Sequence, residues 1–84
     1  MAVEFTPNAS KHRIPHQDAL YAVLHHEVAV DIPGRDGFKA ATLYIGHPHG
    51  QTDRYIEVIA EVIPPRGFKI FYVMPLSPKN RKYL

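Results

Sequence analysis

Lys11-His12-Arg13 is the densest group of side chains in this sequence that could act on a phosphodiester. The Lys and Arg side chains can bind a phosphate group, and His12 can accept or donate a proton because imidazole changes charge near neutral pH. The same three cations would also complement the carbonyl end of a short helix, which is a sufficient structural reason for them. Both interpretations stay open at this point.

A second set of candidates lies in the second half of the chain. Cleavage of RNA without a metal requires a base for the 2′-hydroxyl proton, cations for the charged phosphorane and an acid for the leaving 5′-oxygen. Glu, His and Arg can fill these roles, and Tyr can stack on a base or donate a proton. Alternating Glu on a strand is also ordinary solvent-facing patterning. The set comprises Arg54, Glu57, Glu61, Lys69, Tyr72, Lys79, Arg81, Lys82 and Tyr83.

The six histidines do not form a recognised metal-binding pattern. The pairs His25-His26 and His47-Pro48-His49 are not completed by an acid or a cysteine at a known ligand spacing, so we expect no metal and no cofactor. His25 and His26 are expected to cap a helix instead. A nucleophile elbow, a phosphate-binding glycine loop and a dinucleotide fingerprint are absent, which disfavours the common hydrolases, nucleotide triphosphatases and dehydrogenases.

Length and composition indicate one small domain spanning residues 1–84, with 45% hydrophobic residues and no cysteine. The sequence shows no secretory signal and no apolar stretch that would span a membrane, and we expect a cytoplasmic protein. Charge is distributed unevenly: residues 66–84 hold five Lys/Arg and no acid, whereas residues 1–65 hold five Lys/Arg and eight acids. This basic end would suit a polyanionic partner, or it is a solvated tail.

Two helices are expected near the N-terminus, after a short strand at Ala2–Phe5. Thr6-Pro7 is typical of a helix start, and this first helix would run to about Arg13. Ile14-Pro15 would end it, and a second helix would run from about Pro15 to His26. Its apolar stripe consists of Ala19, Leu20, Val23 and Leu24.

Strands are expected from Val28 onward, where hydrophobic residues begin to recur at every second position. The turn-forming residues Pro33–Gly37 indicate a loop, and the last three strands would form an antiparallel meander. We therefore expect an α+β domain in which two N-terminal helices pack on one face of a three- to four-stranded antiparallel sheet, leaving the other face exposed. Val28–Ile32 is the first segment of period two, and the meander comprises Ala40–Gly46, Tyr55–Ile63 and Phe68–Met74.

The order of these residues resembles the BrnT-like toxins of bacterial toxin–antitoxin pairs, over nearly the whole chain. The similarity rests on Glu4-Phe5, Lys11-His12, Leu43–Gly46, Ile56–Ile59 and Met74-Pro75. The resemblance implies a RelE-like fold, ribonuclease activity that stops translation, and a cognate antitoxin with a DNA-binding domain. Lys11 and His12 match the family's Lys-His motif, Gly46 its strand-end glycine, Glu57 its acid, and Lys79 with Arg81 its basic tail.

The leading hypothesis is therefore a metal-independent endoribonuclease that cleaves mRNA, free or on the ribosome. His12, Glu57, Tyr72 and Arg81 are the predicted catalytic residues. The predicted RNA-binding residues are Lys11, Arg13, Arg54, Lys69, Lys79, Lys82 and Tyr83.

Among these toxins the sequence most resembles the short toxin-like proteins of actinobacteria, and it departs from their pattern at three positions. Ser77 replaces an Arg, Asn80 replaces a Tyr, and Tyr72 replaces a His. Loss of a guanidinium is not a neutral exchange, because a bidentate phosphate contact disappears with it. The alternative is thus a catalytically inactive module that binds a partner protein through its sheet face. An edge strand at the end of the meander would also allow pairing with a second copy, as a homodimer.

Overall fold

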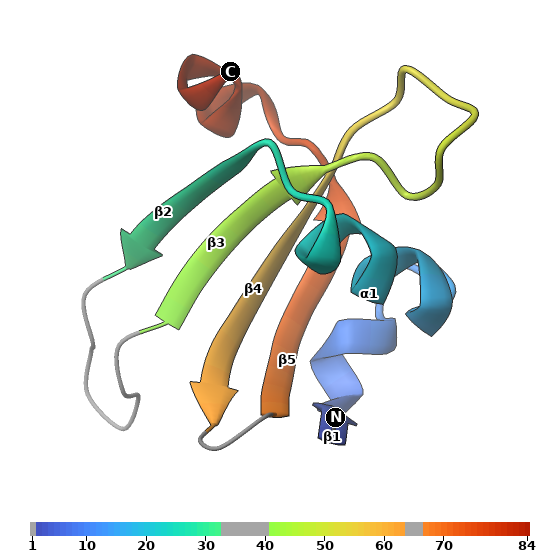
Figure 1. Ribbon diagram of the computed structural model, residues 1–84, viewed down its shortest axis with the longest axis vertical. Helices are drawn as coiled ribbons and strands as arrows, with labels where there is room; N and C mark the ends of the chain where they lie inside the picture. The colour runs from blue at the N-terminus through green and yellow to red at the C-terminus, as the bar shows by residue number, and fades with distance from the viewer. Residues whose placement is uncertain (1, 33–40, 64–66) are drawn as a thin grey trace.

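The structure, a computed structural model, describes residues 2–32, 41–63 and 67–84 (Figure 1). They form one five-stranded sheet with the order β1-β5-β4-β3-β2, one α-helix and two 3₁₀ helices. The strands are β1 (Ala2–Phe5), β2 (Val28–Ile32), β3 (Ala41–Gly46), β4 (Ile56–Ile63) and β5 (Gly67–Pro75). The helical elements are η1 (Pro7–Ser10), α1 (His16–Leu24) and η2 (Pro78–Tyr83).

Strands β2 to β5 follow one another as antiparallel neighbours, which confirms the predicted meander of the last three strands. Val30 pairs with Leu43 and Leu43 with Ile59, so these three residues form a row across β2, β3 and β4. The β4–β5 register shifts between Ile59 and Ala60, a β-bulge. The predicted loop Pro33–Gly37 lies outside the described residues.

The predicted fold was wrong in the size and type of the sheet. β1 pairs in parallel with β5, from Ala2 opposite Gly67 to Phe5 opposite Ile70, so the sheet is mixed and has five strands. A three- to four-stranded antiparallel RelE-like sheet is therefore excluded. Hydrophobic alternation identifies a strand but not its partner, and these two partners lie at opposite ends of the chain.

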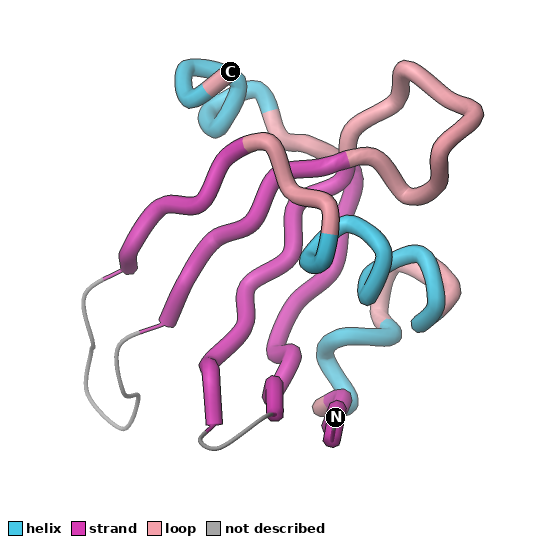
Figure 2. Tube along the Cα trace, in the orientation of Figure 1, coloured by secondary structure: helices cyan, strands magenta, loops and turns pink. Residues whose placement is uncertain are grey.

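The prediction of two N-terminal helices was also wrong. The first is the single 3₁₀ turn η1, separated by a loop from α1, the one α-helix of the described residues (Figure 2). Thr6 precedes η1 with Pro7 at its first position, but the Thr6 hydroxyl donates to the carbonyl of Phe71 on β5, 3.1 Å away, and makes no cap. Pro15 disfavours the helical conformation at Ile14, which prevents η1 from continuing into α1.

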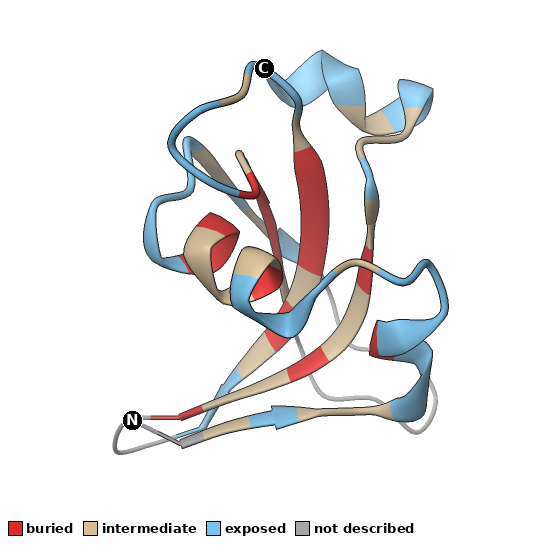
Figure 3. Cartoon of the chain, turned by 90° about the vertical axis from the view of Figure 1, so that its right-hand side faces the viewer, coloured by how far each residue is buried: buried red, intermediate tan, exposed pale blue. Residues whose placement is uncertain are grey.

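The main core lies between α1 and the sheet. Figure 3 shows the buried residues on the strands behind α1 and on the side of the helix that faces them. Ala19, Ala22 and Val23 pack there against residues such as Tyr44 and Val58. The predicted apolar stripe of α1 is only partly buried, because the side chain of Leu24 at the end of the helix is 51% exposed.

The opposite face of the sheet is not left open as expected, because η2 covers part of it. Glu57 lies between Ile56 and Val58, which belong to the α1 core, and alternation directs it to the other face. There it is only 3% exposed, and the side-chain amide of Asn80 from η2 donates to its carboxylate. Leu43 and Ile45 are buried outside the α1 core cluster and form the start of a second, smaller packed layer.

Candidate functional site

A pocket of about 270 Å³ lies beside the N-terminus of α1 and the ends of β4 and β5; we call it the basic pocket. Two of the predicted RNA-binding residues, Arg13 and Arg54, line it together with the predicted base His12. Arg13 and Arg54 lie 41 residues apart in the sequence, and the fold brings their two segments together. The remaining lining residues are Ile14, Pro15, Asp18, Pro48, Ile56 and Pro75.

His12 lines this pocket and also contacts Tyr72, which is not among the lining residues. The Nε2 atom of His12 lies 3.2 Å from the hydroxyl of Tyr72, and the rings meet edge to face with centroids 5.6 Å apart. In the tautomer in which Nε2–H donates to Tyr72, Nδ1 keeps a lone pair that can accept a proton. Two of the four predicted catalytic residues are therefore in direct contact, although 60 residues separate them in the sequence.

Arg13 enters the pocket from an unusual backbone conformation. Its φ of 58° lies in the left-handed region, which costs energy for a residue with a Cβ atom. The turn is closed by the Arg13 N–H, which donates to the carbonyl of Ser10 over 3.1 Å. This conformation lets the chain reverse between η1 and α1 while His12 and Arg13 both reach the same pocket.

Arg54 is carried by the loop between β3 and β4, and a His–Glu pair holds that loop. The Nδ1 atom of His47 donates to the carbonyl of Arg54 over 2.7 Å, and its Nε2 lies 2.9 Å from the carboxylate of Glu27. The His47 ring also stacks on Tyr55, with centroids 4.3 Å apart. Both ring nitrogens face oxygen acceptors, so His47 fixes the loop that presents Arg54.

Glu27 also acts on Tyr55. The Tyr55 hydroxyl donates a hydrogen bond to this carboxylate, which raises the pKa of the phenol above its ordinary value. Partial desolvation and the negative charges of Glu27 and Asp53 raise it further. Tyr55 therefore keeps its proton at neutral pH and completes the cluster of Glu27, His47 and Tyr55.

Glu57, a predicted proton acceptor, lies away from the basic pocket. Its carboxylate is buried beneath η2 and bonded to Asn80, on the face opposite α1. A general base must be able to reach a substrate that arrives from solvent. The buried position of Glu57 instead gives this residue the role of anchoring η2.

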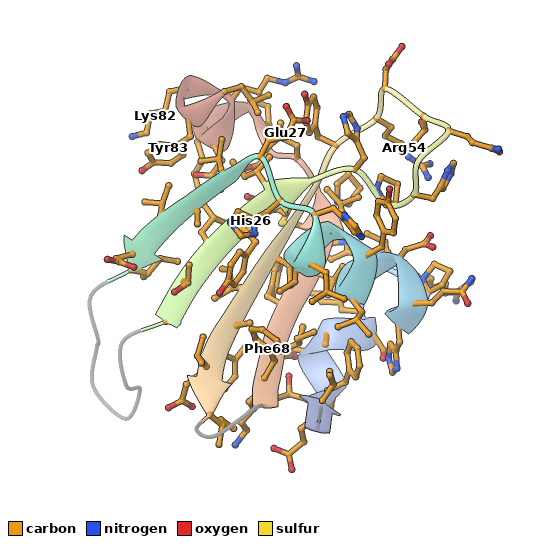
Figure 4. All side chains as sticks on the ribbon, viewed as in Figure 1. His26, Glu27, Arg54, Phe68, Lys82 and Tyr83 are labelled. Carbon is orange, nitrogen blue, oxygen red and sulfur yellow. The ribbon has the colours of Figure 1, made fainter. Side chains whose placement is uncertain are left out.

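The basic tail is separated from the basic pocket. Figure 4 shows Arg54 on its loop and Lys82 with Tyr83 on η2, at opposite sides of the view. Lys79, Lys82 and Tyr83 line another depression, and Arg81 is exposed on the same 3₁₀ helix. The predicted single cationic site is therefore divided into two surfaces.

Lys69 and Lys11 join neither surface. The Lys69 ammonium lies 4.0 Å from the carboxylate of Glu4, its neighbour across the β1–β5 pair. Lys11 is exposed and lies next to His12 in sequence, but its side chain does not line the basic pocket.

The other histidines have structural contacts. His26 donates from Nδ1 to the carbonyl of Val23, 2.7 Å away, and so caps the end of α1 as predicted. His16 stacks on Phe5 and His25 on Tyr21. In the described part of the chain, no group of three His, Cys, Asp or Glu residues is placed to hold a metal ion.

Sequence reasoning missed the cluster of Glu27, His47 and Tyr55 and the bond from Asn80 to Glu57. Glu27 lies 20 residues from His47, and Glu57 lies 23 residues from Asn80, so no spacing within one element indicates these contacts. The contact of His47 with Glu27, in the segment between α1 and β2, required the fold.

Comparison with known proteins finds no matching family model, no matching curated protein and no matching solved structure. In the described residues, no helix is both long and apolar enough to cross a membrane.

Proposed function

We propose that this protein is an endoribonuclease that binds single-stranded RNA at the basic pocket and cleaves it without a metal. The observation that carries the proposal is the contact between His12 and Tyr72 beside Arg13 and Arg54. A titratable base, a phenol and two guanidinium groups are the components that phosphodiester cleavage requires. Here His12, Arg13 and Arg54 line one pocket, and Tyr72 contacts His12 without lining that pocket itself.

His12 accepts the proton of the ribose 2′-hydroxyl, whose oxygen then attacks the adjacent phosphorus. Arg13 and Arg54 stabilise the charge of the phosphorane, and Tyr72 orients the His12 ring and provides a nearby proton donor. The P–O5′ bond breaks, the 5′-oxygen takes up a proton, and the products are a 2′,3′-cyclic phosphate and a 5′-hydroxyl end. Asp18 also lines the pocket, so its lining is not purely cationic.

The resemblance to BrnT-like toxins supports mRNA as the substrate, the bacterial cytoplasm as the place of action, and an antitoxin as the partner. In this proposal the protein inhibits translation by destroying mRNA. Lys11 supplies an additional long-range attraction for RNA next to the pocket.

The test is incubation of the purified chain with a 5′-labelled single-stranded RNA in EDTA, with the product ends identified by their sensitivity to phosphatase treatment after acid opening. We expect 2′,3′-cyclic phosphate ends, and at least a hundredfold slower cleavage by His12→Ala, because general acid–base catalysis contributes about 10²–10⁴-fold.

His25→Ala is the matched control, since His25 is also exposed and lies against a tyrosine, Tyr21, but does not line the basic pocket. It should cleave at the wild-type rate. Equal loss in both variants, or cleavage unaffected by His12→Ala, would contradict the proposed site.

A second candidate is the catalytically inactive binding module. It is favoured by the use of Asn80 and Glu57 to seat η2, because both positions that the resemblance associates with the toxin site then serve the fold. RNA binding without cleavage, or no RNA binding by a folded protein, would select this function over the nuclease.

A further inference from the structure

The face of the sheet opposite α1 carries a groove of about 530 Å³ between η2 and β2; we call it the η2 groove. Its floor is aliphatic and comes from three strands: Val30 and Ile32 of β2, Leu43 of β3 and Ile59 of β4. Val30, Leu43 and Ile59 are cross-strand neighbours, and they form a continuous apolar row. Leu43 is buried, whereas the other three floor residues keep part of their surface exposed.

The wall of the groove is cationic. Lys79, Lys82 and Tyr83 of η2 line it, and the Lys82 ammonium lies 5.2 Å from the centre of the Tyr83 ring. Within the described residues neither lysine forms an ion pair. The groove has one carboxylate, Asp31, at the β2 side. An apolar floor below unpaired cations favours a ligand that combines apolar side chains with negative charge.

The groove opens onto the edge of the sheet. β2 ends the strand order, and among the described strands it pairs only with β3. The outer backbone groups of an edge strand are available to an added strand, whose alternate side chains would then face the same side as Val30 and Ile32. The bond from Asn80 to Glu57 holds η2 in place, so the wall is preformed.

We propose that the η2 groove binds an extended, acidic segment of a partner protein, which adds a strand beside β2. Its apolar side chains lie on the aliphatic floor, and its carboxylates meet Lys79 and Lys82. A second copy of this chain fits less well, because the symmetric arrangement would bring the lysines of both copies together. RNA fits less well, because an aliphatic floor offers it neither stacking planes nor hydrogen bonds. The proposal is independent of nuclease activity at the basic pocket.

The experiment is an NMR titration of the full chain with an eight-residue blocked peptide in which Glu alternates with Val. We expect backbone shifts concentrated in residues 28–32 and 78–83, and weaker binding as salt is raised from 50 to 500 mM. A peptide in which Lys alternates with Val tests whether binding requires negative charge on the peptide. An eight-nucleotide oligouridine tests whether nucleic acid is the ligand.

Two variants with equal change in net charge localise the site. Lys82→Gln should weaken binding of the acidic peptide about fivefold to tenfold, as expected for loss of one charge-assisted contact. Gln17→Glu, on the exposed surface of α1, should leave the affinity unchanged. The proposal is overturned by absence of shifts at β2 and η2, by equal binding of the Lys-containing peptide, or by oligouridine displacing the acidic peptide from the groove.

Discussion

The side-chain amide of Asn80 donates to the carboxylate of Glu57, which joins the C-terminal 3₁₀ helix to the centre of the sheet. Glu57 is almost completely buried, so its carboxylate depends on this donor in place of water. The position of η2, and with it the shape of the η2 groove, follows from this one contact between β4 and the end of the chain.

Asn80→Asp removes the donor and places a second carboxylate against Glu57. We expect the free energy of unfolding to fall by about 2–3 kcal/mol, measured by urea denaturation, because a buried charge loses its partner. Adding Glu57→Gln reverses the roles of amide and carboxylate and should restore more than half of the loss. Additive losses in the double variant would show that the two side chains do not interact.

Ser77→Ala should be neutral or stabilising by up to about 1 kcal/mol in the same measurement. Ser77 precedes η2 as its N-cap residue, but its hydroxyl makes no cap, and Oγ is buried without a hydrogen-bond partner in the described residues. Removal of an unsatisfied hydroxyl relieves a desolvation penalty. A loss of about 1 kcal/mol, typical of a functioning cap, would contradict this arrangement.

Gly46→Ala tests the close approach of α1 to β3. A Cβ atom at Gly46 would lie 2.9 Å from the carbonyl oxygen of Ala22 and 3.2 Å from the Cα of His26, and neither backbone atom can move alone. We expect a loss of about 1–3 kcal/mol in thermal or urea unfolding. Gly50→Ala is the control: its Cβ would meet only the Tyr21 hydroxyl, at 3.2 Å, and should cost less than about 0.5 kcal/mol.

Tyr55 should titrate above its ordinary pKa, because Glu27 accepts a hydrogen bond from its hydroxyl. A raised pKa in the folded state means that the protonated phenol favours folding. This contribution is complete below the unfolded-state pKa of about 10 and disappears as the pH rises through the folded value. Tyrosine absorbance and NMR titrations should show Glu27→Gln lowering the pKa of Tyr55, and an unchanged titration would exclude the bond.

Arg54→Ala tests phosphate binding at the basic pocket. Removing one phosphate contact should reduce the slope of log K against log salt by about 0.7 for single-stranded RNA. Gln51→Ala, in the same loop, should keep the wild-type slope. Fluorescence anisotropy with a labelled oligonucleotide over a series of salt concentrations measures both, and equal slopes in all three proteins would remove Arg54 from the RNA site.

Local patterns predicted most elements of this fold. Alternation predicted strands at Val28–Ile32, Ala40–Gly46 and Tyr55–Ile63, where the structure has β2, β3 and β4. The spacing of Ala19 and Val23 predicted a helix from about Pro15 to His26, and α1 occupies most of it. These features depend on neighbours within one element, where periodicity reports burial directly.

Contacts between segments that are distant in the chain could not be predicted from the sequence. The parallel β1–β5 pair, the covering of Glu57 by η2 and the division of the basic residues into two surfaces all depend on contacts between different elements. The sequence analysis assigned Arg81 to catalysis and Arg54 to RNA binding at one site, whereas the fold places Arg54 at the basic pocket and Arg81 on η2. His12 and Tyr72 were both predicted as catalytic residues, but no sequence pattern gave their contact.

The pairing of β1 with β5 determines when the sheet is completed. The hydrogen bond from Thr6 to Phe71 at the end of this pair spans 65 residues, so β1 has no strand to join until almost all of the described chain has left the ribosome. During synthesis the hairpins of the meander can form first, because their partners are adjacent in sequence. Strand β1 is therefore synthesised before the other four strands but is the last to be incorporated into the sheet.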